Sequence, residues 1–133
     1  MKDKEINLES VHHELTQVFH AYEKALMSND VDALNGYFWP DARVTRYGIA
    51  DKQIGFDALV DFRRMTPAPD FTRELQDVRI TTFGFEFGTA LTEFIRSDTN
   101  LRGFQSQTWV KFEGVWRIVA AHVSMIHWPN QNN

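Results

Sequence analysis

Hydrophobic residues follow a helical spacing in the first part of the chain. They recur at intervals of three and four positions, at Leu8, Val11, Leu15, Val18, Phe19, Tyr22 and Leu26. This spacing places them on one face of a helix and predicts an amphipathic helix over about residues 8–28. A second, shorter helix is predicted after the capping pair Asn29-Asp30, and a third begins at Phe56 and ends before Pro67.

The second part of the chain is rich in β-branched and aromatic residues, which favour strands. Four long strands are predicted, over residues 72–83, 85–96, 101–112 and 115–128. A short strand over residues 43–47 is predicted between the second and third helices. Helices followed by a meander of strands predict an α+β domain, in which three helices pack in the concave face of a strongly curved, mainly antiparallel sheet.

The last two strands contain the polar residues that indicate a binding pocket. With Glu113 and Gly114 at the centre of a tight turn, regular pairing sets Gln105 opposite His122 and Gly103 opposite Ser124. A shift of one residue would move every side chain to the other face, so this assignment depends on the turn. The polar face then carries Trp109, Gln107, Gln105, Ala120, His122 and Ser124.

Composition limits the class of protein. The 133 residues, of which 43 % are hydrophobic, predict a single domain over residues 1–133, with frayed ends at residues 1–6 and 129–133. A formal net charge of −4 argues against a nucleic-acid partner. No apolar run is long enough to cross a bilayer, and the first residues lack the apolar core of a secretion signal, so we expect a cytoplasmic protein without membrane contact.

The sequence contains no pattern typical of a metal site. It has no cysteine, which removes thiolate ligands, thiol nucleophiles and disulfides. His12 and His13 point in different directions from the first helix, and His13 and His20 are seven positions apart. No two histidines have the one-turn spacing of a local ligand pair, so we expect no metal.

The segment Gly114–Ser124 resembles the closing strand of the nuclear transport factor 2-like superfamily, a group of cone-shaped, cystatin-like α+β proteins. SnoaL-like cyclases, ketosteroid isomerase and the association domain of calmodulin-dependent kinase II belong to this group. The order of elements is similar from the first helix to Trp128. The resemblance implies a curved sheet that encloses a cavity beside the first helix.

Five further segments are similar to the AtzH-like group, which includes the oxalurate-catabolism protein HpxZ. They are Phe19-x-x-Tyr22, Asn29–Leu34, Phe38–Asp41, Thr45–Gly48 and Gln105–Trp109. The resemblance implies a small homo-oligomer without a cofactor. It also implies a compact, planar, anionic ureido substrate, because AtzH is associated with decarboxylating amide hydrolysis of a carboxylated urea and HpxZ with oxalurate.

Tyr22 and Arg46 are the predicted catalytic pair. Tyr22 lies on the apolar stripe of the first helix, where its hydroxyl would donate a hydrogen bond or a proton into the cavity. The planar Arg46 guanidinium suits bidentate binding of a carboxylate, and Gly48 on the same face would leave room for a ligand. The alternatives are a tyrosine that only packs in the core and a solvated arginine on an edge strand.

Three arginines are candidates for the cavity mouth: Arg63 and Arg64 at the end of the third helix, and Arg73 at the start of the following strand. Arg64 is the one we select to bind a carboxylate. The alternative is an ordinary cation at a helix carboxyl end, which interacts favourably with the helix dipole.

Four residues of the last two strands complete the predicted site. Trp109 would form a flat wall for a planar ligand, and Gln105 would hold one tautomer of His122. His122 and Ser124 are assigned to binding and orientation. Two residues apart on a strand they are roughly 7 Å from each other, too far for a serine-hydrolase dyad.

Three functions remain open from the sequence. The leading one is a cofactor-free enzyme that hydrolyses or decarboxylates a carboxylated urea or an oxalurate-like ureide. The absence of a nucleophile or carboxylate base on the polar face favours a non-catalytic binding or accessory protein instead. An isomerase-like proton shuttle requires an acid in the cavity, and Asp41, Asp77 and Glu93 are the available candidates.

The opposite face of the predicted hairpin is apolar and too large to leave in contact with water. We therefore expect a homodimer with twofold symmetry through the outer face of the sheet. The residues assigned to this face are Phe104, Val110, Phe112, Val119, Ala121, Val123 and Met125.

Overall fold

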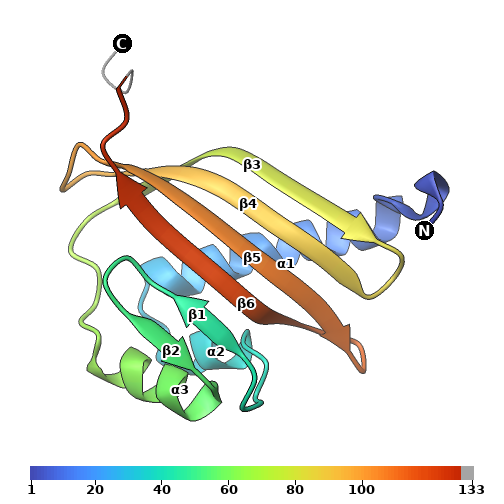
Figure 1. Ribbon diagram of the computed structural model, residues 1–133, viewed down its shortest axis with the longest axis horizontal. Coiled ribbons are helices and arrows are strands. Elements are labelled where there is room, and N and C mark those ends of the chain that lie inside the picture. Colours follow the sequence, from blue (N-terminus) through green and yellow to red (C-terminus); the bar gives the residue numbers. More distant parts are fainter. Residues whose placement is uncertain (130–133) are drawn as a thin grey trace.

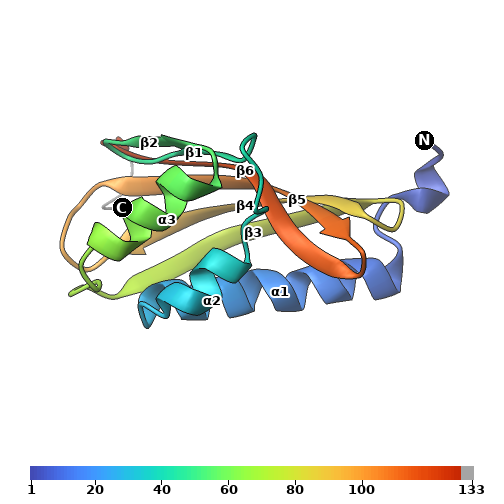
Figure 2. The same cartoon turned by 90° about the horizontal axis from the view of Figure 1, so that it is seen from below.

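The helices of the computed structural model, which describes residues 1–129, all lie on one side of a sheet. Their bounds are Glu9–Met27 (α1), Val31–Gly36 (α2) and Phe56–Met65 (α3), after a 3-10 turn (η1) at Asp3–Glu5. Figures 1 and 2 show α1 running along the sheet, with α2 and α3 beside its carboxyl-terminal half. The predicted α+β architecture is confirmed.

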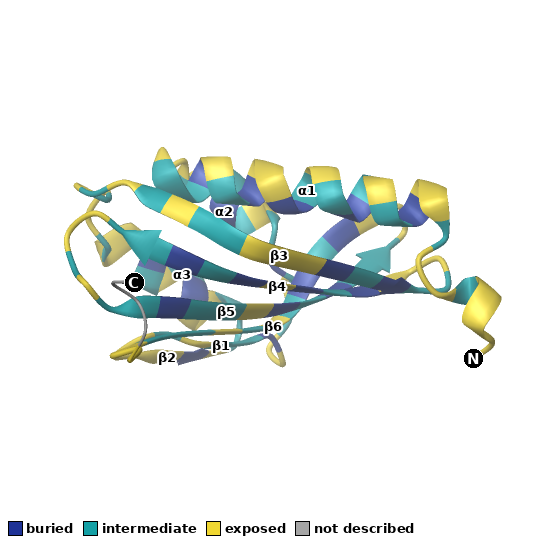
Figure 3. Cartoon of the chain, turned by 90° about the horizontal axis from the view of Figure 1, so that it is seen from above, coloured by how far each residue is buried: buried dark blue, intermediate teal, exposed yellow. Residues whose placement is uncertain are grey.

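The apolar stripe of α1 is the part of the helix that faces the sheet. Its buried residues are Val11, Leu15, Phe19, Tyr22 and Ala25. In Figure 3 the exposed residues of α1 lie on the side away from the strands. The Asp30 side chain caps α2 by accepting a hydrogen bond from the backbone N–H of Ala33 at 3.2 Å, as the Asn29-Asp30 pair predicts.

Six strands form one sheet with the order β2-β1-β6-β5-β4-β3. Their bounds are Thr45–Tyr47 (β1), Lys52–Ile54 (β2), Arg73–Phe83 (β3), Phe87–Arg96 (β4), Arg102–Phe112 (β5) and Val115–Ile126 (β6). All neighbours are antiparallel except β1 and β6, which run parallel. The short strand β2 is not among the predicted elements.

The predicted turn between the last two strands is confirmed, and so is the predicted pairing as far as Trp109, but the pairing predicted beyond Trp109 is wrong. Trp109 lies opposite Ile118 as expected, and then the register shifts, so that Thr108 lies opposite Ala120. Val119 is the additional residue of a β-bulge. On the other edge of β6, Ile118 exchanges two backbone hydrogen bonds with Tyr37 and Trp39.

The bulge exchanges the faces of the second half of β6. Gln105 lies opposite Val123, and Ser106 lies opposite His122. Ala121 and Val123 therefore face the helices, on what we call the inner face of the sheet. His122 and Ser124 lie on the outer face, contrary to the prediction.

The start of the chain is held against the β3–β4 hairpin. Ile6 forms a bridge with Phe83, and the backbone N–H of Gly84 donates to the carbonyl of Glu5 at 2.8 Å. Glu5 and Ile6, in the part of the chain predicted to fray, thus make backbone contacts with this hairpin. Of the predicted frayed end, residues 130–133 lie outside the described part of the chain. Within residues 1–129, no helix combines the length and apolar character needed to cross a membrane.

Candidate functional site

A pocket of about 360 Å³ lies between the inner face of the sheet and the helices. We call it the inner pocket. Its walls come from the end of α1, the end of α3 with the loop at residues 66–71, the short strand β1, and the inner faces of β4, β5 and β6. Tyr22 and Arg46, the predicted catalytic pair, both line it.

Tyr22 is 6 % exposed, and aromatic rings fix its position. Its ring makes edge contacts with Phe38 and Trp109, at centroid distances of 5.9 and 6.3 Å. Its hydroxyl accepts a hydrogen bond from Nη2 of Arg63 at 3.2 Å. Because the hydroxyl accepts from Arg63, its own proton is available to another acceptor.

Arg46 is held in place by a polar network on β1 and β2. Its Nη1 donates to Asp51 at 2.8 Å and to the side-chain carbonyl of Gln53 at 2.9 Å. Gln53 in turn donates to the same carboxylate oxygen of Asp51 at 2.9 Å. Burial and the charge of Arg63 lower the pKa of Arg46, while Tyr22 and Asp51 oppose this shift.

The space beside Gly48, which was expected to admit a ligand, is filled by this ion pair. A Cβ at Gly48 would lie 2.3 Å from a carboxylate oxygen of Asp51 and 2.8 Å from Nη1 of Arg46. Glycine at this position therefore allows Arg46 and Asp51 to meet.

Arg63 is the arginine of α3 that reaches the inner pocket, and the prediction that Arg64 does so is wrong. Arg63 is 6 % exposed, whereas the side chain of Arg64 is 70 % exposed and pairs with Asp61 on the surface. The reason is helical periodicity, since Arg63 follows the buried Leu59 by four residues. The spacing of Phe56, Leu59 and Arg63 is the sequence signal that identifies this buried face.

Two more arginines line the inner pocket, each paired with a carboxylate. Arg73 contacts Glu23 at 2.7 Å and donates to the side-chain carbonyl of Gln105 at 2.6 Å. Arg96 pairs with Asp98 at 2.6 Å. Burial raises the pKa of Glu23, an effect that the positive charge of Arg73 opposes.

The inner face of β5 contributes amide groups to the pocket rather than an aromatic wall. Gln105 and Gln107 line it, whereas Trp109 is completely buried beneath it, contrary to the prediction. Nε1 of Trp109 donates to the side-chain carbonyl of Gln107 at 3.0 Å. This bond orients Gln107 and leaves its amide N–H groups as donors.

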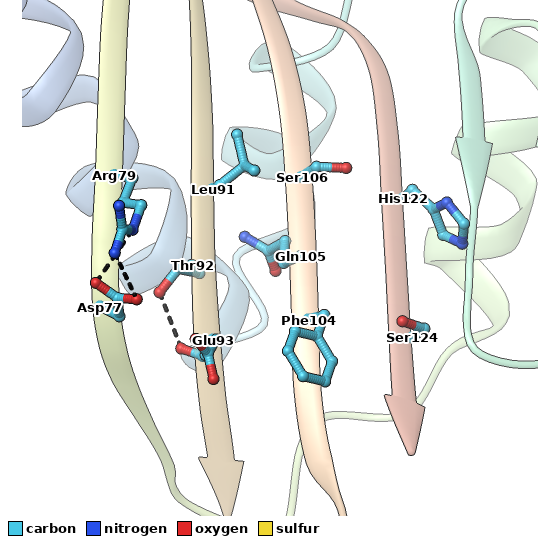
Figure 4. Close-up of a pocket in the computed structure, with 10 residues that line it drawn as sticks. All are labelled: Asp77, Arg79, Leu91, Thr92, Glu93, Phe104, Gln105, Ser106, His122 and Ser124. Carbon is cyan, nitrogen blue, oxygen red and sulfur yellow. Dashed lines mark hydrogen bonds and ion pairs between the residues drawn. The ribbon is translucent and has the colours of Figure 1, made fainter. Parts of the chain in front are cut away.

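The outer face of the sheet contains a second hollow of about 370 Å³, which we call the outer hollow. His122 and Ser124 line it, together with Ser106 and Phe104 (Figure 4). His122 also borders the inner pocket, but its ring contacts that of the exposed Tyr47 at 5.8 Å. The bulge at Val119 thus separates His122 and Ser124 from the hydroxyl of Tyr22.

The three acids considered for a proton shuttle lie outside the inner pocket. Asp41 pairs with Arg43 on the surface, and Asp77 and Glu93 line the outer hollow. The carboxylates that line the inner pocket are Asp51, which is bound to Arg46, and the exposed Asp70. Among residues 1–129, no three histidine, aspartate or glutamate side chains come close enough together to hold a metal ion.

Solved structures with this fold come from several bacteria. A protein of unknown function from Pectobacterium atrosepticum, of the DUF3225 family, is 40 % identical and covers 95 % of this chain and 98 % of its own, with a TM-score of 0.92. A cystatin-like fold protein from Burkholderia xenovorans is 41 % identical, with coverages of 94 and 98 % and a TM-score of 0.90. The comparison with curated proteins gave no match.

More distant structures share the fold alone. A putative ketosteroid isomerase from Parabacteroides distasonis is 17 % identical, with coverages of 93 and 97 % and a TM-score of 0.69. The nuclear transport factor 2-like, cystatin-like architecture is therefore established. The model of the AtzH-like family matches residues 4–129, and the chain belongs to the AtzH-like family.

Proposed function

We propose that this protein is a cofactor-free enzyme that hydrolyses or decarboxylates a small carboxylated urea or an oxalurate-like ureide, as HpxZ-like proteins are associated with oxalurate. The observation that carries the proposal is the joint position of Tyr22 and Arg46 in one pocket. Arg63 connects them, because it donates to the Tyr22 hydroxyl and shares the ring of Phe62 with Arg46.

The dimensions and donors of the inner pocket support a compact anionic ligand. Its guanidinium groups attract a carboxylate, and the amides of Gln105 and Gln107 match the N–H and carbonyl edges of a ureide. The two side-chain hydrogen bonds of Arg46 both start from Nη1, and no described residue accepts a hydrogen bond from its Nε or Nη2. These two N–H groups can therefore bind a carboxylate in a bidentate manner.

The proposed reaction is a proton transfer coupled to loss of carbon dioxide. With an N-carboxylated urea as substrate, Arg46 binds the carboxylate, and Tyr22 donates its proton to the nitrogen that bears it. The bond between that nitrogen and the carboxylate carbon breaks, its electron pair stays on the nitrogen, and carbon dioxide leaves. A proton from water then restores the Tyr22 hydroxyl. Positioning and one acid supply the rate enhancement.

A non-catalytic binding or accessory protein is the second candidate. The observation that favours it is the state of the carboxylates in and beside the pocket. Asp51 is held by Arg46, Glu23 by Arg73, and Asp70 is exposed to solvent, so none of the three is a buried base free of an ion pair. Such a protein would hold the ureide without converting it.

Turnover measurements separate these two functions. Purified protein is incubated with N-carboxylated ureas and with oxalurate, and released carbon dioxide, urea and ammonia are measured. We expect turnover that falls about 100-fold or more in Tyr22→Phe, because general acid catalysis contributes about 10²–10⁴-fold. Arg46→Met should raise KM.

Two neighbouring residues provide matched controls. Tyr37→Phe removes a hydroxyl from a ring 5.8 Å from that of Tyr22 but outside the pocket, and Arg43→Met removes an exposed surface arginine. Both variants should keep the wild-type rate. Binding without turnover would favour the accessory protein, and the absence of both would remove the proposal.

We also propose that two copies associate through the outer face of the sheet. Ala121, Val123 and Met125 do not belong to this face, because the bulge turns them inward. Leu91 and Phe87, which are 45 and 40 % exposed, extend the apolar patch around Phe104 and Val110. Association of this patch with its own copy would remove it from water.

A further inference from the structure

Arg63 differs from the other arginines of the inner pocket in its lack of a counterion. Arg46, Arg73 and Arg96 each contact a carboxylate within 2.8 Å. No carboxylate of residues 1–129 forms an ion pair with Arg63, which lines the same pocket. With each of the other three neutralised by its partner, Arg63 supplies the uncompensated positive charge of this group.

Arg63 is also deeply buried. It is 6 % exposed, and its Nε is buried without a hydrogen-bond acceptor. Nη2 donates to the neutral hydroxyl of Tyr22, and Nη1 has no acceptor among the described residues. A buried charge without a partner is unfavourable, because neither water nor a counterion replaces its lost hydration.

The guanidinium of Arg46 makes the buried charge of Arg63 still more unfavourable. Arg46 and Arg63 lie over the same ring, that of Phe62, at 4.7 and 5.7 Å from its centroid. The proximity of Arg63 contributes to the lowered pKa of Arg46. A ligand carboxylate near this pair would offset the repulsion between the two cations and supply the missing counterion.

We infer that Arg63 is a specificity-determining residue, which makes the inner pocket select ligands with a carboxylate over neutral amides of the same shape. This deepens the proposed function and rests on it for the ureide class. Arg46, already neutralised by Asp51, orients the carboxylate, whereas Arg63 supplies the charge that attracts it. The Arg63 guanidinium also donates a hydrogen bond to the Tyr22 oxygen. The proton of the Tyr22 hydroxyl is therefore directed to the ligand.

Oxamate and its neutral amide, oxamide, test this inference directly, because both are small and planar and differ in one negative charge. Binding is measured by calorimetry and by the change in melting temperature, at fixed ionic strength. We expect wild-type protein to prefer oxamate, and Arg63→Met to weaken oxamate binding about 30-fold or more. Without ligand, Arg63→Met should melt at the same temperature as the wild type or higher, because it removes an uncompensated buried charge.

Arg64→Met is the matched control, since it removes a surface arginine from the adjacent position. It should bind oxamate as the wild type does. Arg63→Lys keeps the charge and serves if Arg63→Met does not fold; it should still prefer oxamate to oxamide. Equal binding of oxamate and oxamide by the wild type, no binding of oxamate, or full oxamate affinity in Arg63→Met would overturn the inference.

The result is independent of turnover. Charge-selective oxamate binding that depends on Arg63, without conversion of any ureide, would reject the proposed enzyme and keep Arg63 as the charge-selecting residue. Ureide turnover with unchanged substrate affinity in Arg63→Met would keep the enzyme and reject the role of Arg63.

Discussion

Arg46 and Asp51 form a 2.8 Å ion pair across the turn between β1 and β2. The side chain of Arg46 is 14 % exposed, whereas that of Asp51 is 36 % exposed, so the pair connects a buried cation to a carboxylate at the pocket edge. Asp51 thus offsets part of the positive charge of Arg46, which would otherwise attract a ligand carboxylate. Asp51 therefore stabilises the protein without ligand, but it lowers the affinity of the pocket for anions.

Asp51→Asn tests this opposition. The change keeps the shape of the side chain but removes the counterion of Arg46, so we expect the free energy of unfolding to fall by about 1 kcal/mol, a modest value because Asp51 is partly solvated. Affinity for oxamate should increase. Asp61→Asn, which removes the partner of the exposed Arg64, is the control and should change neither quantity measurably. Weaker oxamate binding in Asp51→Asn would contradict this account.

Gly48→Ala should disturb the same ion pair from the backbone side. The added methyl group would overlap the ends of the Asp51 and Arg46 side chains, which must separate to admit it. We expect a stability loss of about 1–3 kcal/mol by chemical denaturation. The loss should be smaller in an Asp51→Asn background, since the pair is then already broken. Gly36→Ala, with no atom within 4 Å of the added group, is the control and should not destabilise.

The buried Glu23 gives the protein a specific pH dependence. Because burial raises its pKa in the folded state, the folded protein binds a proton at this site more tightly than the unfolded chain. The contribution of Glu23 to stability is therefore fully present below its unfolded pKa and is lost as pH rises through the raised, folded pKa. The difference in free energy of unfolding between wild type and Glu23→Gln should shift in favour of the wild type as pH falls through this range.

Denaturation of both proteins at several pH values measures that difference. Glu14 is present in both proteins, so its contribution cancels in this difference. The pKa of Glu14 is lowered by its bonds to Lys111 and Trp116, so its effect on stability has the opposite sign. A difference that is constant with pH would contradict the assignment of a raised pKa to Glu23.

Leu91→Glu tests the proposed dimer. The substitution introduces a charge into the apolar patch of the outer face, where Leu91 lies opposite Ser106. Light scattering after size exclusion should give a dimer for the wild type and a monomer for the variant at micromolar concentration. Met65→Glu, at a residue 84 % exposed on α3, should remain dimeric. A monomeric wild type would refute the proposal.

The sequence predicts the long elements of this fold well, because their periodicity extends over many residues. The buried stripe from Val11 to Tyr22 and the four long strands follow directly from it. Strand β2 spans only Lys52–Ile54, too short for alternation to identify it. Its pairing with β1 is set by tertiary structure.

The errors in the predicted site come from two positions where a small structural change moves a side chain. The bulge at Val119 reverses the faces of His122 and Ser124, and no local residue pattern marks it. It lies beside Ile118, which pairs with the distant segment 37–39. Arg63 and Arg64 are adjacent on α3, and only Arg63 lies on its buried face. The apolar spacing of the helix does identify that face. Tyr22 and Arg46 lie in the inner pocket that the resemblance implied for them.

The central claim is that the inner pocket binds a small ureide through its negative charge. The most direct measurement is the affinity of the wild-type protein for oxalurate and for its neutral amide, oxaluramide, by titration calorimetry at two salt concentrations. We expect oxalurate to bind about 30-fold more tightly or better, and this preference to weaken at high salt. Equal affinity for the two compounds, or no binding of oxalurate at millimolar concentration, would contradict it.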